Sequence, residues 1–590
     1  MTFGPNTTFG PQLPFADALH GQKYRGPNES FVESQDRLAA TLSDNEEHRQ
    51  VLKDILRNQR FLAAGRVQSA IGSGRDVTAF NCFVSSTIED SSESIMRVAT
   101  EAFETMRQGG GIGYDFSKIR PKGDRIVSQD SIASGPVSFM EIFNAVCGTV
   151  ASAGHRRGAQ MGVLRVDHPD IEEFLRAKQD QTSLTNFNVS IGVTDEFMDC
   201  VVDGKPFELK FNDKVYKRID AGALWDEIMR GTYDWAEPGV LFLDRINQEN
   251  NLHYMEDISA TNPCGEQPLP PNGACLLGSF NLVKYVNRRP NSPDLYFNYE
   301  AFKYDIPHVV RMMDNVIDNT NYPLPAQEAE AKAKRRMGLG ITGLANAIET
   351  IGYPYGSTEF ILVTKKIMQT LAETAYQTSV ALAIEKGAFP AYDPLEYPMS
   401  NYFEVLSPSL IEDIAKHGTR NSHLISIAPT GTVSICADNI SSGIEPPFSL
   451  TVYRIVQGPE GPTTQTLKDY AYARWGVEGR TANELSVDDH LNVLLACVPY
   501  VDSAVSKTLN VGDEVSFNDF KQIYIKAWRG GAKGCTTFRA AGKRFGILTE
   551  SSDDSTQRRD TGAHGPDGDT KDSEGTACFY DPQTGKKECE

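Results

Sequence analysis

The sequence predicts an α/β fold, because segments of strand character alternate with segments of helix character along most of the chain. Short β-rich runs occur at residues 186–193 and 423–428. A clear amphipathic helix is expected from Asp90, where a capping pattern begins, to the three glycines that start at Gly109. So many alternations in one chain favour a barrel or one large sheet.

The N-terminal region, residues 1–60, is predicted to be an arm followed by helix. Its first 14 residues are rich in Gly, Pro and Thr, and its first 30 are expected to be irregular. Ser-Asp-Asn-Glu at 43–46 forms a capping box, and the segment after it has an apolar face. A helix is therefore expected to begin at this box.

The C-terminal region, residues 549–590, has a different composition. Residues 551–576 contain almost nothing apolar, so they cannot offset their ordering entropy by burial, and a flexible tail is expected. Cys578 and Cys589 follow this stretch. A tether of about 28 residues reaches roughly 30 Å, enough to carry a thiol from the surface into a buried site.

Composition limits the classes of function. The formal net charge of −20 repels nucleic acid phosphates, although a nucleotide-sized ligand needs only a local pocket. Ten cysteines without a C-x-x-C pair or a secretion signal predict neither a disulfide framework nor a structural zinc site. No run approaches the roughly 18 apolar residues that span a bilayer, and a cytoplasmic location is expected.

The most informative stretch is 261–275, Thr-Asn-Pro-Cys-Gly-Glu-Gln-Pro-Leu-Pro-Pro-Asn-Gly-Ala-Cys. Its prolines exclude helix and central strand, so a stiff loop is predicted. Asn262, Cys264 and Glu266 lie close together on it, and Cys275 follows. An amide, a thiol and a carboxylate on one loop can bind a polar substrate, react with it and move a proton. On spacing alone, a Pro-rich structural turn is the alternative.

This loop resembles the finger loop of ribonucleotide reductases, through Asn-Pro-Cys-Gly-Glu at 262–266 and Gly-Ala-Cys-Leu-Leu-Gly-Ser-Phe-Asn-Leu at 273–282. Other segments that resemble the family follow in order over residues 60–548. They are 81–84, 109–113, 156–160, 186–190, 237–247, 335–340, 429–434, 441–446 and 506–510. The resemblance implies a ten-stranded α/β barrel at 61–548, the type shared with glycyl-radical enzymes, with the cysteine loop threaded through its centre.

The resemblance implies a role for each group in the loop and for two further thiols. Cys264 would be the thiyl radical that removes the 3′ hydrogen of a ribonucleotide. Glu266 would be the base on the 3′-hydroxyl, and Asn262 would hold the substrate hydroxyls. Cys82 and Cys275 would protonate the departing 2′-hydroxyl and end as a disulfide.

The tail thiols Cys578 and Cys589 would, by the same resemblance, reduce that disulfide and be recycled by a thioredoxin-like partner. Their spacing departs from the closer spacing common in the family. The three thiol stations would then be a radical carrier, a two-electron reductant and a shuttle.

A second loop is expected to hold the substrate phosphate. It mixes Gly with hydroxyl side chains and can present backbone amides if a helix starts just after it, although most such turns are only turns. The resemblance makes it the phosphate cradle and also assigns Asn81 and Gly111 to the substrate site. The cradle residues are Pro429, Thr430, Gly431, Thr432, Val433 and Ser434.

The radical source is predicted from residues 533–539, Lys-Gly-Cys-Thr-Thr-Phe-Arg. Reductases that import the radical from a partner subunit carry adjacent tyrosines at this place, and this chain has no such pair. The stretch resembles the class II subclass, which implies adenosylcobalamin, the vitamin B12 coenzyme, and no protein-held metal. The alternatives are a class I subunit with a diiron partner, a silent nucleotide-binding regulator and a glycyl-radical lyase.

Regulation is also implied by the resemblance. Asp90 and Arg120 would contact a deoxynucleotide effector, and residues 151–163 would relay its identity to the substrate site. Asp90 has a plain alternative as a helix N-cap. An effector site of this kind favours a homodimer, while the choice between di- and triphosphate substrates stays open.

Overall fold

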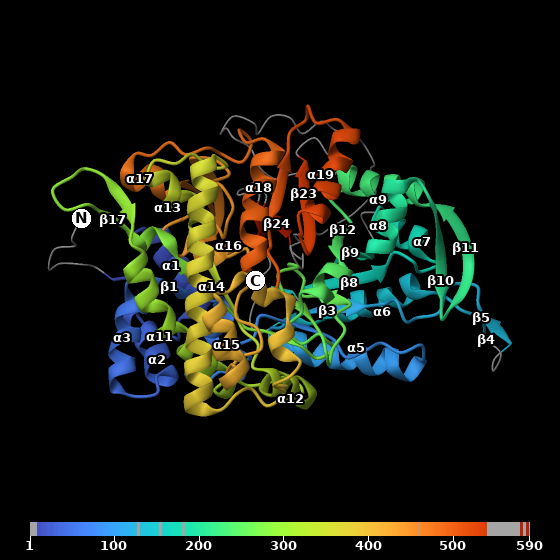
Figure 1. The fold of residues 1–590 in the computed structure, drawn as a ribbon, viewed down its shortest axis with the longest axis horizontal. Helices are drawn as coiled ribbons and strands as arrows, with labels where there is room; N and C mark the ends of the chain where they lie inside the picture. Colours follow the sequence, from blue (N-terminus) through green and yellow to red (C-terminus); the bar gives the residue numbers. More distant parts are fainter. Residues whose placement is uncertain are drawn as a thin grey trace.

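The fold centres on an eight-stranded sheet. The structure is a computed structural model, and it describes residues 9–126, 130–152, 156–157, 159–179, 183–458, 461–539, 579–581 and 586–588. Five neighbouring strands are parallel, and the flanking strands join them in antiparallel fashion (Figure 1). In spatial order the strands are β15 (Ala274–Cys275), β2 (Cys82–Val84), β3 (Gly111–Asp115), β8 (Gln160–Arg165), β9 (Phe187–Val193), β12 (Gly239–Phe242), β23 (Gly534–Arg539) and β22 (Thr508–Val511).

A three-stranded sheet extends this arrangement. β16 (Leu277–Asn281) follows β15 along the chain and pairs with β1 (Phe61–Ala63) and, in parallel, with β19 (Gly338–Thr342). Two isolated parallel bridges, Leu339–Ile425 and Ile427–Val505, continue the order from β19. The α/β class is confirmed, while a count of ten strands in one barrel stays a prediction.

Helices cover the outer face of the large sheet. α5 (Ser92–Arg107), α6 (Pro136–Thr149), α9 (Ala221–Trp235) and α19 (Phe517–Arg529) bury apolar side chains against it in one core cluster (Figure 1). β9 shows the two-residue period of a strand: Phe187, Val189 and Ile191 enter this core. The polar Asn188 and Ser190 alternate with them and face the opposite side, toward the middle of the molecule.

β3 carries glycine on its inward face. Ile112 and Tyr114 belong to the outer core, whereas Gly111 and Gly113 point the other way. A Cβ atom on Gly113 would lie 1.8 Å from the carbonyl oxygen of Thr261. The chain at Thr261 therefore lies directly against β3, and only glycine permits this approach.

The N-terminal region is more regular than predicted. Residues expected to be irregular contain α1 (Pro14–Tyr24), so that expectation was wrong. The helix has no side-chain N-cap, and its start signals are Pro14 at the first position and Asp17 in the first turn. It is followed by α2 (Phe31–Leu42) and α3 (Glu46–Arg57). The cap of α3 is Asn45, two residues after the start of the predicted box.

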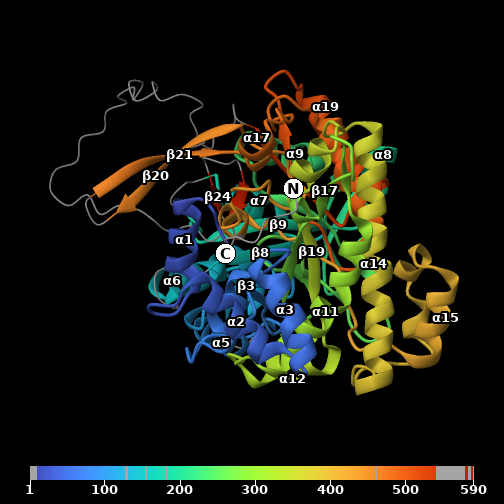
Figure 2. The same ribbon diagram turned by 90° about the vertical axis from the view of Figure 1, so that its left-hand side faces the viewer.

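A second core packs α2 and α3 against α11 (Tyr299–Asp318) and α14 (Thr358–Lys386), which line one side of the molecule (Figure 2). The hairpin of β20 (Thr451–Gly458) and β21 (Gly461–Lys468) projects from the body (Figure 2). Among the residues that the structure describes, no helix is both long and apolar enough to cross a membrane.

The remaining elements connect these layers. The short strands pair as hairpins: β4 (Arg125–Ile126) with β5 (Ser131–Ile132), β6 (Ala151–Ser152) with β7 (Arg156–Arg157), β10 (Pro206–Phe211) with β11 (Lys214–Asp220), and β17 (Val286–Arg288) with β18 (Leu295–Phe297). The other helices are α4 (Gly65–Ala70), α7 (Ile171–Arg176), α8 (Asp195–Asp203), α10 (Leu243–Gln248), α12 (Pro325–Lys334), α13 (Leu344–Thr350), α15 (Pro408–His417), α16 (Gly431–Ile435), α17 (Tyr470–Trp475) and α18 (Val487–Cys497).

Candidate active site

The predicted finger loop is the tip of a small antiparallel hairpin, β13 (Ala260–Thr261) and β14 (Pro268–Leu269). Asn262 organises the tip: its N–H donates to the Gln267 carbonyl at 3.1 Å, and its Oδ1 accepts from the Gln267 N–H at 3.0 Å. The Gly265 N–H donates to the Asn262 carbonyl at 3.0 Å. These bonds fix Cys264 and Glu266 on a closed turn, and both are buried.

The finger is held in place by neighbouring segments. The Glu266 carbonyl accepts from the Ala504 N–H and from the Ser426 hydroxyl, each at 2.9 Å. On the other side, the Asn188 amide of β9 donates to the Pro263 carbonyl at 3.5 Å. Together with the contact at Gly113, these bonds hold the loop between the large sheet on one side and the segments that contain Ser426 and Ala504 on the other.

The two predicted dithiol cysteines face each other across a strand pair. Cys82 on β2 and Cys275 on β15 are direct Cα partners in the antiparallel register, and both are reduced and buried. Directly opposed residues have Cα atoms about 4.5–5.5 Å apart. Disulfides form at Cα separations of about 4.4–6.8 Å, so this pair can close without moving the backbone.

Burial raises the pKa of Cys275 well above the ordinary value for a thiol, and the negative forms of Glu266, Cys82 and Cys264 raise it further. Cys275 therefore keeps its proton at neutral pH, as a proton donor must. Because Cys82 lines the same cavity as Cys264 and Glu266 and lies opposite Cys275, the finger and the dithiol pair form one cluster. A side chain on Gly111, the β3 partner of Cys82, would meet the Cys82 sulfur at 3.2 Å.

The predicted phosphate loop has an ordered hydroxyl network. Thr430 adopts a left-handed backbone conformation, with φ of 53°, immediately before α16. Its Oγ1 accepts from the Gly443 N–H at 2.8 Å and lies 2.9 Å from Thr342 Oγ1 and 3.1 Å from Ser434 Oγ. A helix does follow Thr430, but it begins inside the predicted loop: α16 covers Gly431–Ile435, and its first residues face a cavity.

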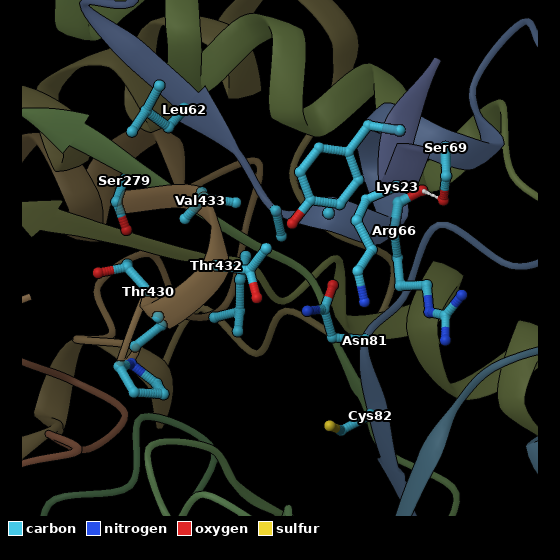
Figure 3. Close-up of a pocket in the computed structure, with 18 of the residues that line it drawn as sticks. Lys23, Leu62, Arg66, Ser69, Asn81, Cys82, Ser279, Thr430, Thr432 and Val433 are labelled. Carbon is cyan, nitrogen blue, oxygen red and sulfur yellow. Dashed lines mark hydrogen bonds between the residues drawn. The ribbon is translucent and has the colours of Figure 1, made fainter. Parts of the chain in front are cut away.

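One cavity of about 660 Å³ brings most of the predicted residues together (Figure 3). Asn81, Cys82 and Thr432 point toward a common space in the close-up. The predicted residues in its lining are Asn81, Cys82, Cys264, Glu266, Pro429, Thr430, Gly431, Thr432 and Val433. Three others, Cys275, Gly111 and Ser434, do not line it but pair with residues that do. Asn262 does not line it either, and it bonds to Gln267 within the finger.

The predicted effector residues lie apart from this lining and pair with each other. Arg120 Nε donates to Asp90 Oδ2 at 2.5 Å, and the Arg120 N–H donates to Asp90 Oδ1 at 3.2 Å. Asp90 does not cap α5, because Ser91 is the N-cap and accepts from the Ser94 N–H. The plain alternative for Asp90 was therefore wrong. Of the relay loop at 151–163, residues 153–155 and 158 lie outside the described residues.

The tail cysteines Cys578 and Cys589 also lie outside the described residues. The segments next to them in the sequence are described: β24 (Phe579–Asp581) pairs with β25 (Lys586–Glu588), and β25 contacts α16 of the phosphate loop. The structure thus brings the C-terminal hairpin beside the wall of the cavity.

The sequence analysis missed one wall of the cavity. This wall comes from α1 and α4 and from the segment after α4, and it includes Lys23, Tyr24, Arg66, Ser69 and Arg75 (Figure 3). Arg66 lies within the region of family resemblance, whereas α1 lies outside it and carries no motif. Only the fold brings α1 to the site.

Comparison with known proteins agrees with this geometry. The family description "Ribonucleotide reductase, barrel domain" matches residues 80–471 and 463–538. The chain belongs to the ribonucleotide reductase family. Relatives include the "Vitamin B12-dependent ribonucleoside-diphosphate reductase" of Mycobacterium tuberculosis (strain CDC 1551 / Oshkosh), 34% identical, with 90% of this chain and 79% of the relative covered. The protein of that name from Thermoplasma acidophilum is 34% identical over 79% of this chain and 62% of its own length.

More distant reductases match as well. The "Vitamin B12-dependent ribonucleotide reductase" of Streptomyces coelicolor is 26% identical, with 85% of this chain and 60% of the relative covered. These names agree with the predicted subclass and do not favour the class I alternative. The predictions of the family and of a reductase are confirmed, and the roles of individual residues stay predictions.

Proposed function

We propose that this chain reduces ribonucleotides to 2′-deoxyribonucleotides through a thiyl radical on Cys264, with adenosylcobalamin as the radical generator. One observation carries the proposal: Cys264, Glu266 and Cys82 line a single cavity, and Cys275 lies directly opposite Cys82. Sequence resemblance alone does not require this juxtaposition, and the reaction does.

The chain's own residues can account for each step at the substrate. The Cys264 radical takes the hydrogen atom from the 3′ carbon while Glu266 accepts the 3′-hydroxyl proton. A thiol of the Cys82–Cys275 pair protonates the 2′-hydroxyl, which leaves as water. The other thiol of the pair gives a hydrogen atom to the 2′ carbon, so the pair loses two electrons in total and becomes a disulfide. Glu266 returns its proton to the 3′ oxygen, and Cys264 returns its hydrogen atom to the 3′ carbon, which restores the radical on Cys264.

Asn262 and the phosphate loop position the substrate. The Asn262 Nδ2 group is buried and has no hydrogen-bond partner among the described residues. Asn262 lies just behind the cavity lining, two residues before Cys264, and a substrate hydroxyl that reaches past Cys264 would satisfy this donor. The backbone N–H groups of residues 430–433, with the hydroxyls of Thr430 and Thr432, receive the phosphate nearest the ribose. Burial of Cys264 and Glu266 keeps water from the radical.

The site fits adenosylcobalamin in one respect that the structure shows. Cys264 lies on the wall of an open cavity, so its thiol can be reached by a reactive group from outside the finger. Cobalamin carries its cobalt in its own ring, and the fit needs no metal ligand from the chain. When bound, this cofactor supplies the radical that removes the hydrogen atom of the thiol.

The proposal extends to partners. Cys578 and Cys589 reduce the active-site disulfide and are recycled by a thioredoxin-like protein, which is supported by the contact between the C-terminal hairpin and α16. A deoxynucleotide effector binds at Asp90 and Arg120 of a homodimer; the salt bridge between these two residues places them side by side, as one effector site requires. The reduced thiols of Cys82, Cys264 and Cys275 suit a reducing cytoplasm.

The test uses the full chain with a ribonucleoside diphosphate and dithiothreitol, with and without adenosylcobalamin. Deoxyribonucleotide should appear only with the cofactor, and Cys264→Ser should abolish it. Cys200→Ser is the matched control, because Cys200 is outside the lining of the cavity. Activity that ignores cobalamin and requires a diiron partner would refute the radical source and leave the reductase assignment intact.

A further inference from the structure

The cavity has two chemically different walls. The phosphate loop contributes amides and hydroxyls from Pro429 to Val433. Among the described residues that line the cavity, the cations come from the opposite wall and are Lys23, Arg66 and Arg75. Lys23, on the last turn of α1, is exposed at the mouth, whereas the thiol cluster is buried.

Helix α1 is fixed to the phosphate loop and to α4. The N–H groups of Gln12 and Leu13 donate to Asp438 Oδ1 at 2.8 and 2.9 Å, and His20 Nε2 lies 2.9 Å from Gln68 Oε1. These bonds connect α1 to the segment after α16 and to α4. The position of Lys23 is therefore set by the fold.

Tyr24 seats the end of α1. It packs with Val433 and Cys436 of the phosphate-loop helix in a small apolar cluster. The other side of the Tyr24 ring lies against Gly65, the first residue of α4. A Cβ at this position would be 2.7 Å from the ring, so α4 can come this close only because residue 65 is glycine. Lys23 is thus held next to a residue that contacts both walls.

Arg66 is placed in a similar way. A Cβ on Gly109 would lie 2.7 Å from the Arg66 guanidinium carbon, so the guanidinium packs over the backbone that follows α5. Nearby, Asn81 Oδ1 is a buried acceptor with no hydrogen-bond partner among the described residues. Figure 3 shows Lys23, Arg66 and Asn81 on the side of the cavity opposite Thr430 and Thr432, with Arg66 farther from the threonines than Lys23 and Asn81.

We propose that Lys23 and Arg66 hold the distal phosphate of the nucleotide substrate and make the enzyme selective for nucleotides with more than one phosphate. With the ribose at the thiols and the first phosphate at the loop, the chain of phosphates runs toward the mouth, where these cations lie. A protein of net charge −20 repels a free polyphosphate, so a local pair of cations is needed to hold it. This inference rests on the proposed function.

The test measures binding of cytidine 5′-monophosphate and 5′-diphosphate to the full chain by calorimetry. Lys23→Gln and Arg66→Gln should each weaken the diphosphate about tenfold, the loss of one charge-assisted contact, and change the monophosphate less than about twofold. Lys23→Arg should restore the preference because it restores the charge.

Two exposed residues provide controls with the same change of charge. Lys303→Gln on α11 and Arg107→Gln at the end of α5 remove exposed cations outside the cavity lining and should leave both affinities unchanged. Thermal unfolding of each variant establishes that the fold is intact.

Three results would overturn the inference. Unchanged diphosphate affinity would mean that the cations do not contact the substrate. An equal loss for both nucleotides would place the contact on the ribose or the first phosphate. If the unaltered chain binds neither nucleotide, both the proposed function and this inference fail. In the other two outcomes only the role of Lys23 and Arg66 fails, and the proposed function stands.

Discussion

The contact between the finger and β3 gives the sharpest prediction, the substitution Gly113→Ala. The added Cβ would lie 1.8 Å from the Thr261 carbonyl oxygen, and real Cβ contacts are essentially never under 3.0 Å. The finger backbone must therefore move by about 1.2 Å, the difference between these distances, because β3 is held in the sheet on both sides. Cys264 follows three residues later on the same stiff loop.

A misplacement of about 1 Å in a catalytic group costs on the order of 100-fold in rate. We therefore expect kcat of Gly113→Ala for ribonucleotide reduction to fall about 100-fold, with an overpacking cost of about 1–3 kcal/mol in the free energy of unfolding. Turnover with adenosylcobalamin and dithiothreitol measures the first quantity, and urea unfolding measures the second.

The matched control is Gly162→Ala on the neighbouring strand β8. Its Cβ would meet the flexible end of Met140 at 2.7 Å, on the outer side of the sheet. This variant should keep kcat within about threefold of the unaltered chain, because the finger is untouched. If Gly113→Ala is equally active, the finger does not depend on this contact and the reasoning is refuted.

Three further predictions concern the thiols, the phosphate loop and α1. Cys275→Ser should yield no deoxyribonucleotide while nucleotide binding is unchanged, because no disulfide can form; product in repeated turnover would contradict the dithiol assignment. Thr430→Val should raise KM about tenfold by removing the hydroxyl bonded to Gly443, and an unchanged KM would show that the network does not shape the site. Burial lowers the pKa of His20 to about 4, so the unfolded chain binds its proton first and stability falls from pH 6.5 toward 4 by up to about 3 kcal/mol. His20→Gln lacks this loss, and superimposable pH profiles of unfolding would refute it.

The sequence predicted the chemistry of the site better than its walls. Cys264 and Glu266 are close in the chain, and the prolines around them restrict the backbone, so their loop could be predicted locally. Lys23 could not be predicted, because its place depends on bonds from Gln12 and Leu13 to Asp438, more than 400 residues away. Pro14 and Asp17 are local signals for a helix, but they do not say which elements that helix packs against.

Local signals also failed where two neighbours compete for one role. Both Asp90 and Ser91 are good N-caps, and the sequence alone favoured the first. In the structure Ser91 caps α5, which leaves the Asp90 carboxylate to pair with Arg120. Arg120, the partner of Asp90, is 30 residues away; the family resemblance assigned both residues to an effector site and predicted no bond between them.

The position of Cys82 and Cys275 has a thermodynamic consequence. The strand pair that carries them, β2 and β15, is one of the two antiparallel joints of the large sheet. A disulfide there would close a loop of about 190 residues, and the chain-entropy estimate for such a cross-link is about 5 kcal/mol. Each catalytic cycle would form this disulfide between β2 and β15, and each re-reduction would break it. The oxidised enzyme, with the Cys82–Cys275 disulfide, should therefore unfold at a higher temperature than the reduced enzyme that can start a new cycle.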